Sequence, residues 1–391
     1  MKHSTDRIRT SHVGALSATA EWAEAQARIA KGAAFAGEVT PIVTGLVKRQ
    51  QRVGIDCIGD GEFWAGRGFM HYAHHFSGVT IRPLKPGERG SMREETRERE
   101  AFPKLYADMD ATQTLFCVPG ERPVPRLGAR MVIGAPLKYN GTATIDREIA
   151  TFKAAITQSG ADVDEAFICA LAPGWLDHFI YNEYYKTDEE YVFALAEAMR
   201  DEYRAIADAG FILQIDDPGV ATSWDMFKPA LSLADYHAYL GRRADALNHA
   251  LAGIPQERVR YHFCWGSWHG AHTHDIPLRD IIDYVLRVNA QCYSFEASNV
   301  RHEHEWKVWR DVKLPDGKML MPGVISHATN IVEHPELVAE RIKRFAGIAG
   351  RENVIAGADC GLGHRVHEEL VWAKFSSLVE GAKIASRELW G

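Results

Sequence analysis

The sequence predicts an α/β fold, a single (β/α)8 barrel domain over residues 1–391, and three observations support this. Short apolar runs alternate with longer helical patterns almost to the end of the chain, which is typical of βαβ units around a parallel sheet. Titratable and metal-binding residue types follow many of these runs, at the strand ends where barrel active sites lie. The chain length of 391 residues is within the range of single barrels.

Nine apolar runs are candidate strands, one more than the eight places in such a barrel. We expect one of them, with the run near residue 130 as the first candidate, to lie outside the barrel. The runs lie near residues 7–14, 55–61, 130–135, 165–171, 211–216, 258–264, 291–296, 319–326 and 353–359.

Two of the intervening helices carry clear start and stop signals. Thr187 and Glu190 have the spacing of a capping box, and Gly210 can end the helix that they begin. Pro335 fits the first turn of another helix, which we expect to end near Gly350. The first helix has an apolar stripe that we interpret as core: Val192, Leu195, Ala196, Met199, Tyr203 and Ile206.

Residues 82–128 interrupt this rhythm. Much of the segment consists of Pro, Gly, Arg and Glu, with little apolar content, and its acids and bases are interleaved. Interleaved charges are typical of a solvated surface. We therefore predict an exposed excursion inserted in the barrel.

Composition excludes several classes of partner. Apolar residues make up 46% of the chain, enough for a large core, and 45 Lys and Arg against 52 Asp and Glu give a net charge of −7. This balance offers no attraction to nucleic acid or to an anionic membrane. No apolar run approaches the roughly 18 residues of a membrane span, and the first residues lack the apolar core of a secretory signal. We expect a cytoplasmic protein, and a homo-oligomer is compatible with the sequence.

Residues able to do chemistry gather where the predicted strands end. Because parallel strands in a barrel present their carboxyl ends on one face, these side chains should share a site. In chain order they are Glu62, Asp216, His262, Cys264, Glu296, His327 and Cys360.

Four of these residues form a candidate zinc site. His262 and Cys264 are two residues apart, a spacing that on a strand puts both side chains on the same side. Glu296 and Cys360 end later predicted strands, and zinc favours His nitrogen, Cys sulfur and carboxylate oxygen. From the residues alone, two buried thiols beside a hydrogen-bonded histidine fit equally well. If zinc binds, two thiolates and a carboxylate leave the site near −1, which favours attack by a metal-bound thiol over hydrolysis.

Several short motifs resemble the catalytic barrel of cobalamin-independent methionine synthases, within the uroporphyrinogen decarboxylase-like superfamily. HFCWG resembles the zinc motif of that family, SFEAS its glutamate ligand and ADCGL its second cysteine. The resemblance covers most of the chain. It implies that zinc is held by His262, Cys264, Glu296 and Cys360.

The same resemblance implies roles around the zinc. LQIDDP is similar to the family's IDEP, which implies that Asp216 holds the amino group of an amino-acid thiol, and GDGEF implies that Glu62 contacts substrate. PGVISH resembles the strand that bears the family's proton donor, which implies that His327 is the general acid. RTSHVGAL resembles the family's THVGS, but Ala15 stands where the family has a serine that helps to bind the substrate carboxylate.

The resemblance implies a transferase that moves a methyl or alkyl group onto a zinc-bound thiol, with a small thiol and a methyl donor as its partners. An alternative is the related epoxyalkane:coenzyme M transferases, which open an epoxide with a thiol by the same zinc chemistry. A metal-free decarboxylase of the superfamily and a non-catalytic binding barrel are two further alternatives. Full methionine synthases carry a second, N-terminal half that helps to hold folate, and we do not find it in this chain, so the use of folate stays open.

The remaining histidines, cysteines and tryptophans have simpler interpretations. Residues 268–275 and 301–306 are rich in His and acids, but we expect loop or surface positions there and not a second metal site. His71, His74 and His75 are expected to be exposed or hydrogen-bonded. Small apolar core positions are expected for Cys57, Cys117, Cys169 and Cys292, and either core packing or a pocket wall for Trp265 and Trp268.

Overall fold

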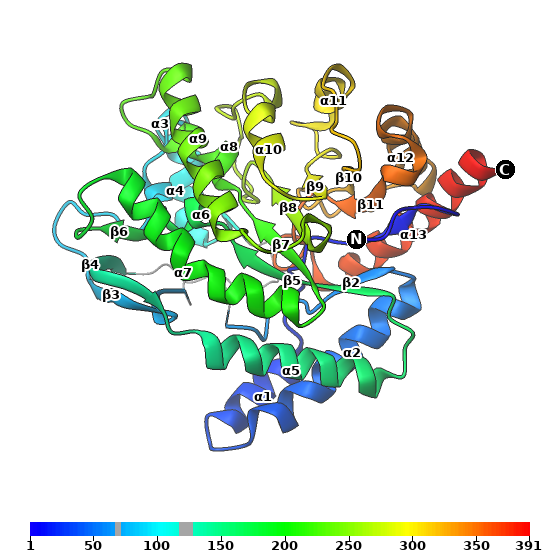
Figure 1. The fold of residues 1–391 in the computed structure, drawn as a ribbon, viewed down its shortest axis with the longest axis horizontal. Coiled ribbons are helices and arrows are strands. Elements are labelled where there is room, and N and C mark those ends of the chain that lie inside the picture. Colours follow the sequence, from blue (N-terminus) through cyan, green and yellow to red (C-terminus); the bar gives the residue numbers. More distant parts are fainter. Residues whose placement is uncertain (67–71, 117–127) are drawn as a thin grey trace.

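A computed structural model describes residues 1–66, 72–116 and 128–391. Its main sheet has eight strands in the order β1-β11-β10-β9-β8-β7-β5-β2, paired in parallel. Their bounds are β1 Arg9–Thr10, β2 Cys57–Gly59, β5 Glu165–Leu171, β7 Ile212–Asp216, β8 Val259–Phe263, β9 Cys292–Phe295, β10 Met319–Ile325 and β11 Ile355–Ala358. A parallel bridge between Ser11 and Cys57 joins the two ends of this order. The strands therefore form a nearly closed barrel (Figure 1), which confirms the predicted fold class.

Helices surround the barrel (Figure 1) and at least one follows each of its strands along the chain. Their bounds are α1 Ala20–Ile29, α2 Phe35–Val53, α3 Arg97–Ala101, α4 Pro103–Thr112, α5 Thr142–Ser159, α6 Pro173–Leu176, α7 Asp188–Asp208, α8 Gly219–Met226, α9 Leu233–Ala250, α10 Ile282–Arg287, α11 Trp306–Asp311, α12 Pro335–Ala349 and α13 Glu368–Trp390. Among the described residues, no helix is long and apolar enough to cross a membrane.

The predicted helix signals are confirmed. The Thr187 hydroxyl accepts a hydrogen bond from the Glu190 N–H at 3.1 Å, and the Glu190 carboxylate accepts one from the Lys186 N–H at 3.0 Å. The six residues of the predicted apolar stripe on α7 are all fully buried. Pro335 begins α12, and Gly350 follows its last residue with a φ of 86°.

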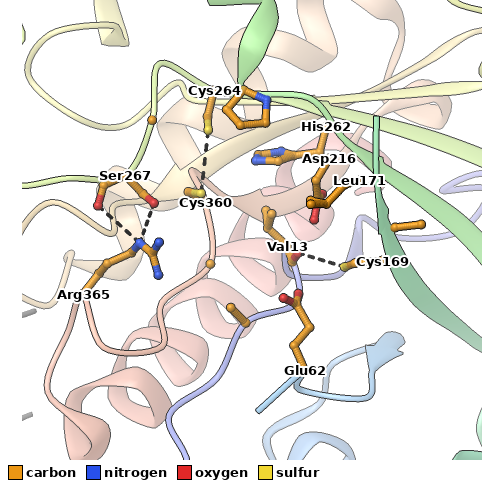
Figure 2. Close-up of a pocket in the computed structure, with 15 residues that line it drawn as sticks. Val13, Glu62, Cys169, Leu171, Asp216, His262, Cys264, Ser267, Cys360 and Arg365 are labelled. Atoms are coloured by element: carbon orange, nitrogen blue, oxygen red, sulfur yellow. Dashed lines mark hydrogen bonds between the residues drawn. The ribbon is translucent and has the colours of Figure 1, made fainter. Parts of the chain in front are cut away.

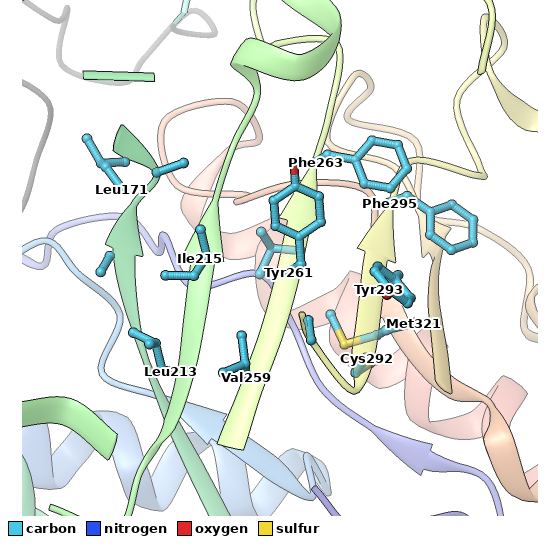
Figure 3. Packing of buried hydrophobic residues seen from close by; sticks show 14 of the residues in the cluster. Leu171, Leu213, Ile215, Val259, Tyr261, Phe263, Cys292, Tyr293, Phe295 and Met321 are labelled. Carbon is cyan, nitrogen blue, oxygen red and sulfur yellow. The ribbon is translucent and has the colours of Figure 1, made fainter. Parts of the chain in front are cut away.

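Alternation along the strands separates the core from the site. On β7 and β8 the odd-numbered residues, such as Ile215 and Tyr261, pack outward in the hydrophobic cluster that fills the space between strands and helices (Figure 3). The even-numbered residues point to the barrel interior, and Asp216 and His262 reach the pocket at its mouth. Since side chains alternate with a period of two, the same strands supply both the core and the chemistry.

The run near residue 130 lies outside the barrel, as expected. It is β4, Ala129–Tyr139, which pairs with β3, Phe76–Pro83, and with β6, Ile180–Asn182, in a separate sheet of three strands. The prediction missed β3 and β6. Neither strand has a regular apolar run in the sequence: β3 lies mostly before the predicted excursion and extends into its first two residues, and β6 lies just after α6.

The prediction that residues 82–128 are exposed is partly wrong. Glu95 and Glu100 are exposed, but Glu98 and Tyr106 are buried. Glu98 accepts hydrogen bonds from the Tyr106 hydroxyl and, at 2.6 Å, from the Thr273 N–H. The described part of the excursion therefore packs on the loop that follows β8. Residues 117–127 lie outside the described residues.

Candidate active site

His262, Cys264 and Cys360 come together at the mouth of the barrel. One ligand atom from each lies within 4.8 Å of the others, and the two sulfur atoms are 3.9 Å apart (Figure 2). His262 is on β8 and Cys264 directly follows this strand, so alternation turns both side chains inward. The predicted spacing argument is thus consistent with the structure.

Cys360 reaches this group from a distant strand. It follows β11, which β9 and β10 separate from β8 in the sheet order. The loop after β11 lies against the loop after β1, where Gly363 N–H donates to the Ala15 carbonyl at 2.9 Å. A Cβ on Gly361 would lie 2.7 Å from the Cβ of Ala15, so a glycine allows this close approach. The cysteine therefore reaches across the mouth from a strand that is not a neighbour of β8.

The donor atoms suit a soft metal ion. The Nδ1 atom of His262 is 3.0 Å from the Ser294 hydroxyl, while its Nε2 atom is buried and has no hydrogen-bond partner among the described residues. Two thiolates on one tetrahedral zinc, each about 2.3 Å from it, lie about 3.8 Å apart, close to the 3.9 Å separation here. An orphaned imidazole nitrogen beside two thiols fits zinc.

The two thiols are hydrogen-bonded to each other. The hydrogen bond between Cys264 and Cys360, together with burial, raises the pKa of Cys264, whereas the same hydrogen bond and the nearby His262 lower the pKa of Cys360. Without a cation, burial of two adjacent thiolates is unfavourable because their charges repel. A divalent cation between them would remove this penalty.

Glu296 lies beside this group but is not within its 4.8 Å set. It directly follows β9, where its Oε1 atom accepts a hydrogen bond from Trp265 N–H at 2.8 Å and its Oε2 atom accepts one from the Asn299 side chain. Burial raises its pKa well above the usual range. Metal ligation by Glu296 therefore stays a prediction.

His327 lies in a second cluster, with Glu296 and Asp359, whose closest donor atoms are within 4.8 Å of one another. Burial lowers the pKa of His327 to about 3 and raises that of Asp359 to about 6. The Nδ1 atom of His327 is buried without a hydrogen-bond partner in the described part of the chain. Near neutral pH the imidazole is thus neutral, and it lies beside Asp359, whose pKa is close enough to neutrality for the carboxyl to exchange a proton with it.

Glu62, Asp216 and Cys169 line the other side of the pocket and also lie within 4.8 Å of one another. Burial, together with the charge of Glu62, raises the pKa of Asp216 well above its usual range. Its Oδ1 atom accepts a hydrogen bond from Gln214 at 2.7 Å. Two carboxyl groups so close together are suited to bind a cation such as an ammonium group.

The first and third of these groups, with His262, Cys264 and Cys360 and with Glu62, Asp216 and Cys169, face one cavity of about 160 Å³ at the barrel mouth (Figure 2), whereas Glu296, His327 and Asp359 do not line it. Arg365 also lines it, with Ser267 and Gly266 from the loop after β8. Our sequence interpretation missed Arg365, although it lies in the same loop as Cys360. It assigned Cys169 to the core, and that thiol is indeed buried but also lines the cavity.

The structure also describes most of the remaining cysteines and histidines. Cys57 and Cys292 are buried free thiols, and Cys117 and His71 lie outside the described residues. His74 is exposed and His75 buried. No metal-binding group from residues 268–275 or 301–306 is found among the described residues.

The two histidine-rich segments instead form a hydrogen-bonded network. His302 lies between Asp275, at 2.9 Å, and Glu305, at 3.0 Å. Trp265 stacks on His302 with ring centroids 3.8 Å apart, and Trp268 stacks on His272 at 4.4 Å. Trp265 is buried in the core, whereas Trp268 lines a second, small cavity of about 20 Å³ together with Tyr106 and Leu115, so each of the two alternatives holds for one of these tryptophans.

Comparisons with known proteins agree with this geometry. The sequence model of the family described as "Cobalamin-independent synthase, Catalytic domain" matches residues 179–384, just over half of the chain. A methionine synthase of Saccharolobus solfataricus is 26% identical over 234 residues, which are 58% of this chain and 60% of that protein. A methionine synthase of Sulfurisphaera tokodaii is 25% identical over 223 residues, 57% of each chain. The chain thus matches about 60% of the length of its curated relatives.

Solved structures share the fold over nearly the whole chain. A B12-independent methionine synthase from Shewanella sp. W3-18-1, solved with selenomethionine, superimposes with a TM-score of 0.69 at 16% identity, covering 98% of this chain and 99% of that one. A protein described as a putative vitamin-B12 independent methionine synthase from Listeria monocytogenes gives 0.63 at 18% identity, with the same coverage. With its barrel, its site at the strand ends and the match over residues 179–384, the chain belongs to the cobalamin-independent methionine synthase family.

Proposed function

We propose that this protein is a zinc-dependent transferase that moves a methyl or alkyl group onto the sulfur of a small thiol. The observation that carries the proposal is the group of His262, Cys264 and Cys360, with an orphaned imidazole nitrogen, in the same cavity as Glu62 and Asp216. We also propose that residues 1–391 act as one domain, because the strands that supply these residues extend from β2 to β11.

His262, Cys264 and Cys360 would hold the zinc, with Glu296 as the fourth protein ligand. Zinc, when bound, would favour the thiolate form of the substrate thiol at neutral pH and keep it nucleophilic. The chain provides three donors that match its preferences and a carboxylate next to them.

Glu62 and Asp216 would bind an amino group of the thiol. Without a cation nearby, burial and mutual repulsion keep a proton on this pair, as the raised pKa of Asp216 indicates. An ammonium group would favour the ionised form of both carboxyls, because opposite charges stabilise each other in a buried site. Binding of an amino thiol should therefore release a proton. The cavity of about 160 Å³ is below the roughly 300–1,000 Å³ of sites for drug-sized ligands, which favours a small thiol.

His327 would supply the proton that the reaction consumes. As the sulfur forms its new bond to carbon, the bond from that carbon to nitrogen or oxygen breaks, and the leaving atom takes the electron pair and needs a proton. The buried carboxyl of Asp359 lies beside the imidazole, and because burial raises its pKa to about 6 it can pick up a proton near neutral pH and pass it to His327. Burial of the cluster keeps bulk water from competing for this proton.

The test is a product assay. Zinc-loaded protein is incubated with homocysteine or with coenzyme M, each against methylfolates and small epoxides, and products are identified by mass. We expect a thioether, and its mass identifies the thiol and the carbon donor together. The proposal fails if no thioether forms with any pair, or if Cys264→Ser protein without zinc forms it at the same rate.

A further inference from the structure

The feature that the proposed function leaves unused is Arg365, which lines the cavity from the loop after β11. Its guanidinium is held in place by hydrogen bonds from Nε to the Ser267 hydroxyl and carbonyl, the latter at 3.2 Å, and from Nη1 to the Gly363 carbonyl at 3.0 Å. Because these acceptors are on the loop after β8 and in its own loop, the side chain has little freedom to turn away from the cavity.

The charge of Arg365 has no counter-ion among the described residues. None of the ion pairs found there includes it, and its Nη2 atom makes no hydrogen bond there. In the view of Figure 2, the two thiols lie between Arg365 on one side and Asp216 on the other. Ala15, which also lines the cavity, presents only a methyl group. A half-buried guanidinium with a free N–H is a strong site for an oxyanion, since charged hydrogen bonds to carboxylates and sulfonates are stronger than neutral ones.

We propose that Arg365 binds the acidic group of the thiol substrate, a carboxylate or a sulfonate. This inference rests on the proposed function and narrows its substrate class to small aliphatic thiol acids. Since the cavity is small, the acid must lie within a few atoms of the sulfur. Arg365 would thus select a thiol that carries a negative charge, while Glu62 and Asp216 would bind a positively charged group on the thiol when it has one.

The experiment measures thiol binding to the cobalt-substituted full chain through the sulfur-to-metal charge-transfer band. Four thiols separate the two charges: homocysteine has both, 4-mercaptobutanoate and 2-mercaptoethanesulfonate have the acid alone, and 3-aminopropane-1-thiol has the amine alone. The variants are Arg365→Gln, Arg365→Lys and, as a matched control on a neighbouring loop, the exposed Arg301→Gln. Cobalt content and circular dichroism establish that each variant is folded and loaded.

We expect Arg365→Gln to weaken binding of the acid-bearing thiols by roughly 10- to 100-fold, the factor for loss of a charge-assisted hydrogen bond. Binding of 3-aminopropane-1-thiol should change less than about twofold, a difference of under roughly 0.5 kcal/mol. Arg365→Lys should fall between, because it keeps the charge but loses the planar donor fork. Arg301→Gln should match the wild-type protein. The relative loss for carboxylate and sulfonate identifies the preferred acid.

The proposal is overturned if Arg365→Gln binds acid-bearing thiols as the wild type does, or if it weakens all four thiols equally. In both cases the wild-type protein still binds thiol at the metal, so the proposed function survives. If the wild-type protein shows no thiol-dependent band with any of the four, the proposed function and the role of Arg365 fail together.

Discussion

Replacing Gly14 by alanine should disturb the proposed amine subsite although no charged residue is replaced. Gly14 has a φ of +121°, and a Cβ there would lie 1.9 Å from Oε1 of Glu62 and 2.6 Å from the sulfur of Cys169. Both contacts are far too short, so the flexible Glu62 side chain must move away from the position that it shares with Asp216. Glycine is thus needed at this position for two reasons: its backbone conformation disfavours other residues, and the Glu62 carboxylate packed against it leaves no room for a Cβ.

The magnitude follows from these two costs. A non-glycine residue in this backbone conformation lowers the free energy of unfolding by about 1–3 kcal/mol. Placing an extra methyl group in a filled site lowers it by about 1–3 kcal/mol more. We therefore expect Gly14→Ala to lower the free energy of unfolding by about 2–6 kcal/mol. Displacing one of two carboxylates from an ammonium group should weaken binding of 3-aminopropane-1-thiol by roughly 10- to 100-fold.

Gly32→Ala is the matched control. Gly32 has a φ of +100°, and no described atom lies within 4 Å of a Cβ added there. It should show the conformational cost alone, about 1–3 kcal/mol, with thiol binding unchanged. Urea denaturation gives the free energies, and the charge-transfer band of the cobalt protein gives the affinities. If Gly14→Ala binds the amino thiol as tightly as Gly32→Ala does, the assignment of Glu62 to the amine is refuted.

Three further predictions concern proton transfer and pH. His327→Gln should slow transfer by roughly 10²- to 10⁴-fold for a poor leaving group, with normal zinc content and a smaller defect for a methylsulfonium donor, which leaves without a proton; equal defects for both donors in product assays would count against its role as the acid. Binding of an amino thiol near pH 7 should release a proton from the Glu62 and Asp216 pair and grow tighter as the pH rises, since the raised pKa of Asp216 means that the free site is protonated; calorimetry in two buffers of different ionisation enthalpy measures this, and Asp216→Asn should release fewer protons. Burial raises the pKa of Asp217 from 3.8 to about 6, so between about pH 4 and 6 the folded state binds a proton that the unfolded state does not, and the stabilisation from this proton is lost as the pH rises through that interval. The free energy of unfolding of Asp217→Asn, measured relative to the wild type, should therefore increase by roughly 3 kcal/mol from about pH 4 to pH 6. A difference between the two proteins that does not change with pH would contradict the shift.

The parts of the site that lie on strands could be predicted from the sequence, because alternation on a strand is a local property. His262 and Cys264 share a side for that reason, and Asp216 ends a strand whose odd-numbered residues form core. The extra strand near residue 130 could be recognised only as one run too many. The run near residue 130 lies outside the barrel because β4 pairs with β3, and the periodicity of a sequence does not show which strands pair.

The parts built by loops could not be predicted, because their contacts join distant segments. Arg365 faces the cavity through bonds to Ser267, 98 residues earlier, and Glu98 is buried because it meets Thr273, 175 residues later. Cys360 was predicted as a ligand from a motif, but its route across the barrel mouth depends on the contact between Gly361 and Ala15. Nothing in the local sequence around Glu98 indicates that a backbone N–H from a distant segment donates a hydrogen bond to its carboxylate.

The most direct test of the central claim is zinc content measured on purified protein by metal analysis, together with circular dichroism. The wild-type protein should bind one zinc ion per chain, and so should Cys292→Ser, which changes a buried thiol away from the cavity. Cys264→Ser and Cys360→Ser should each lose the metal while the barrel stays folded, because a hydroxyl is a much poorer zinc ligand than a thiolate. Full zinc occupancy in both of these variants would contradict the proposed metal centre.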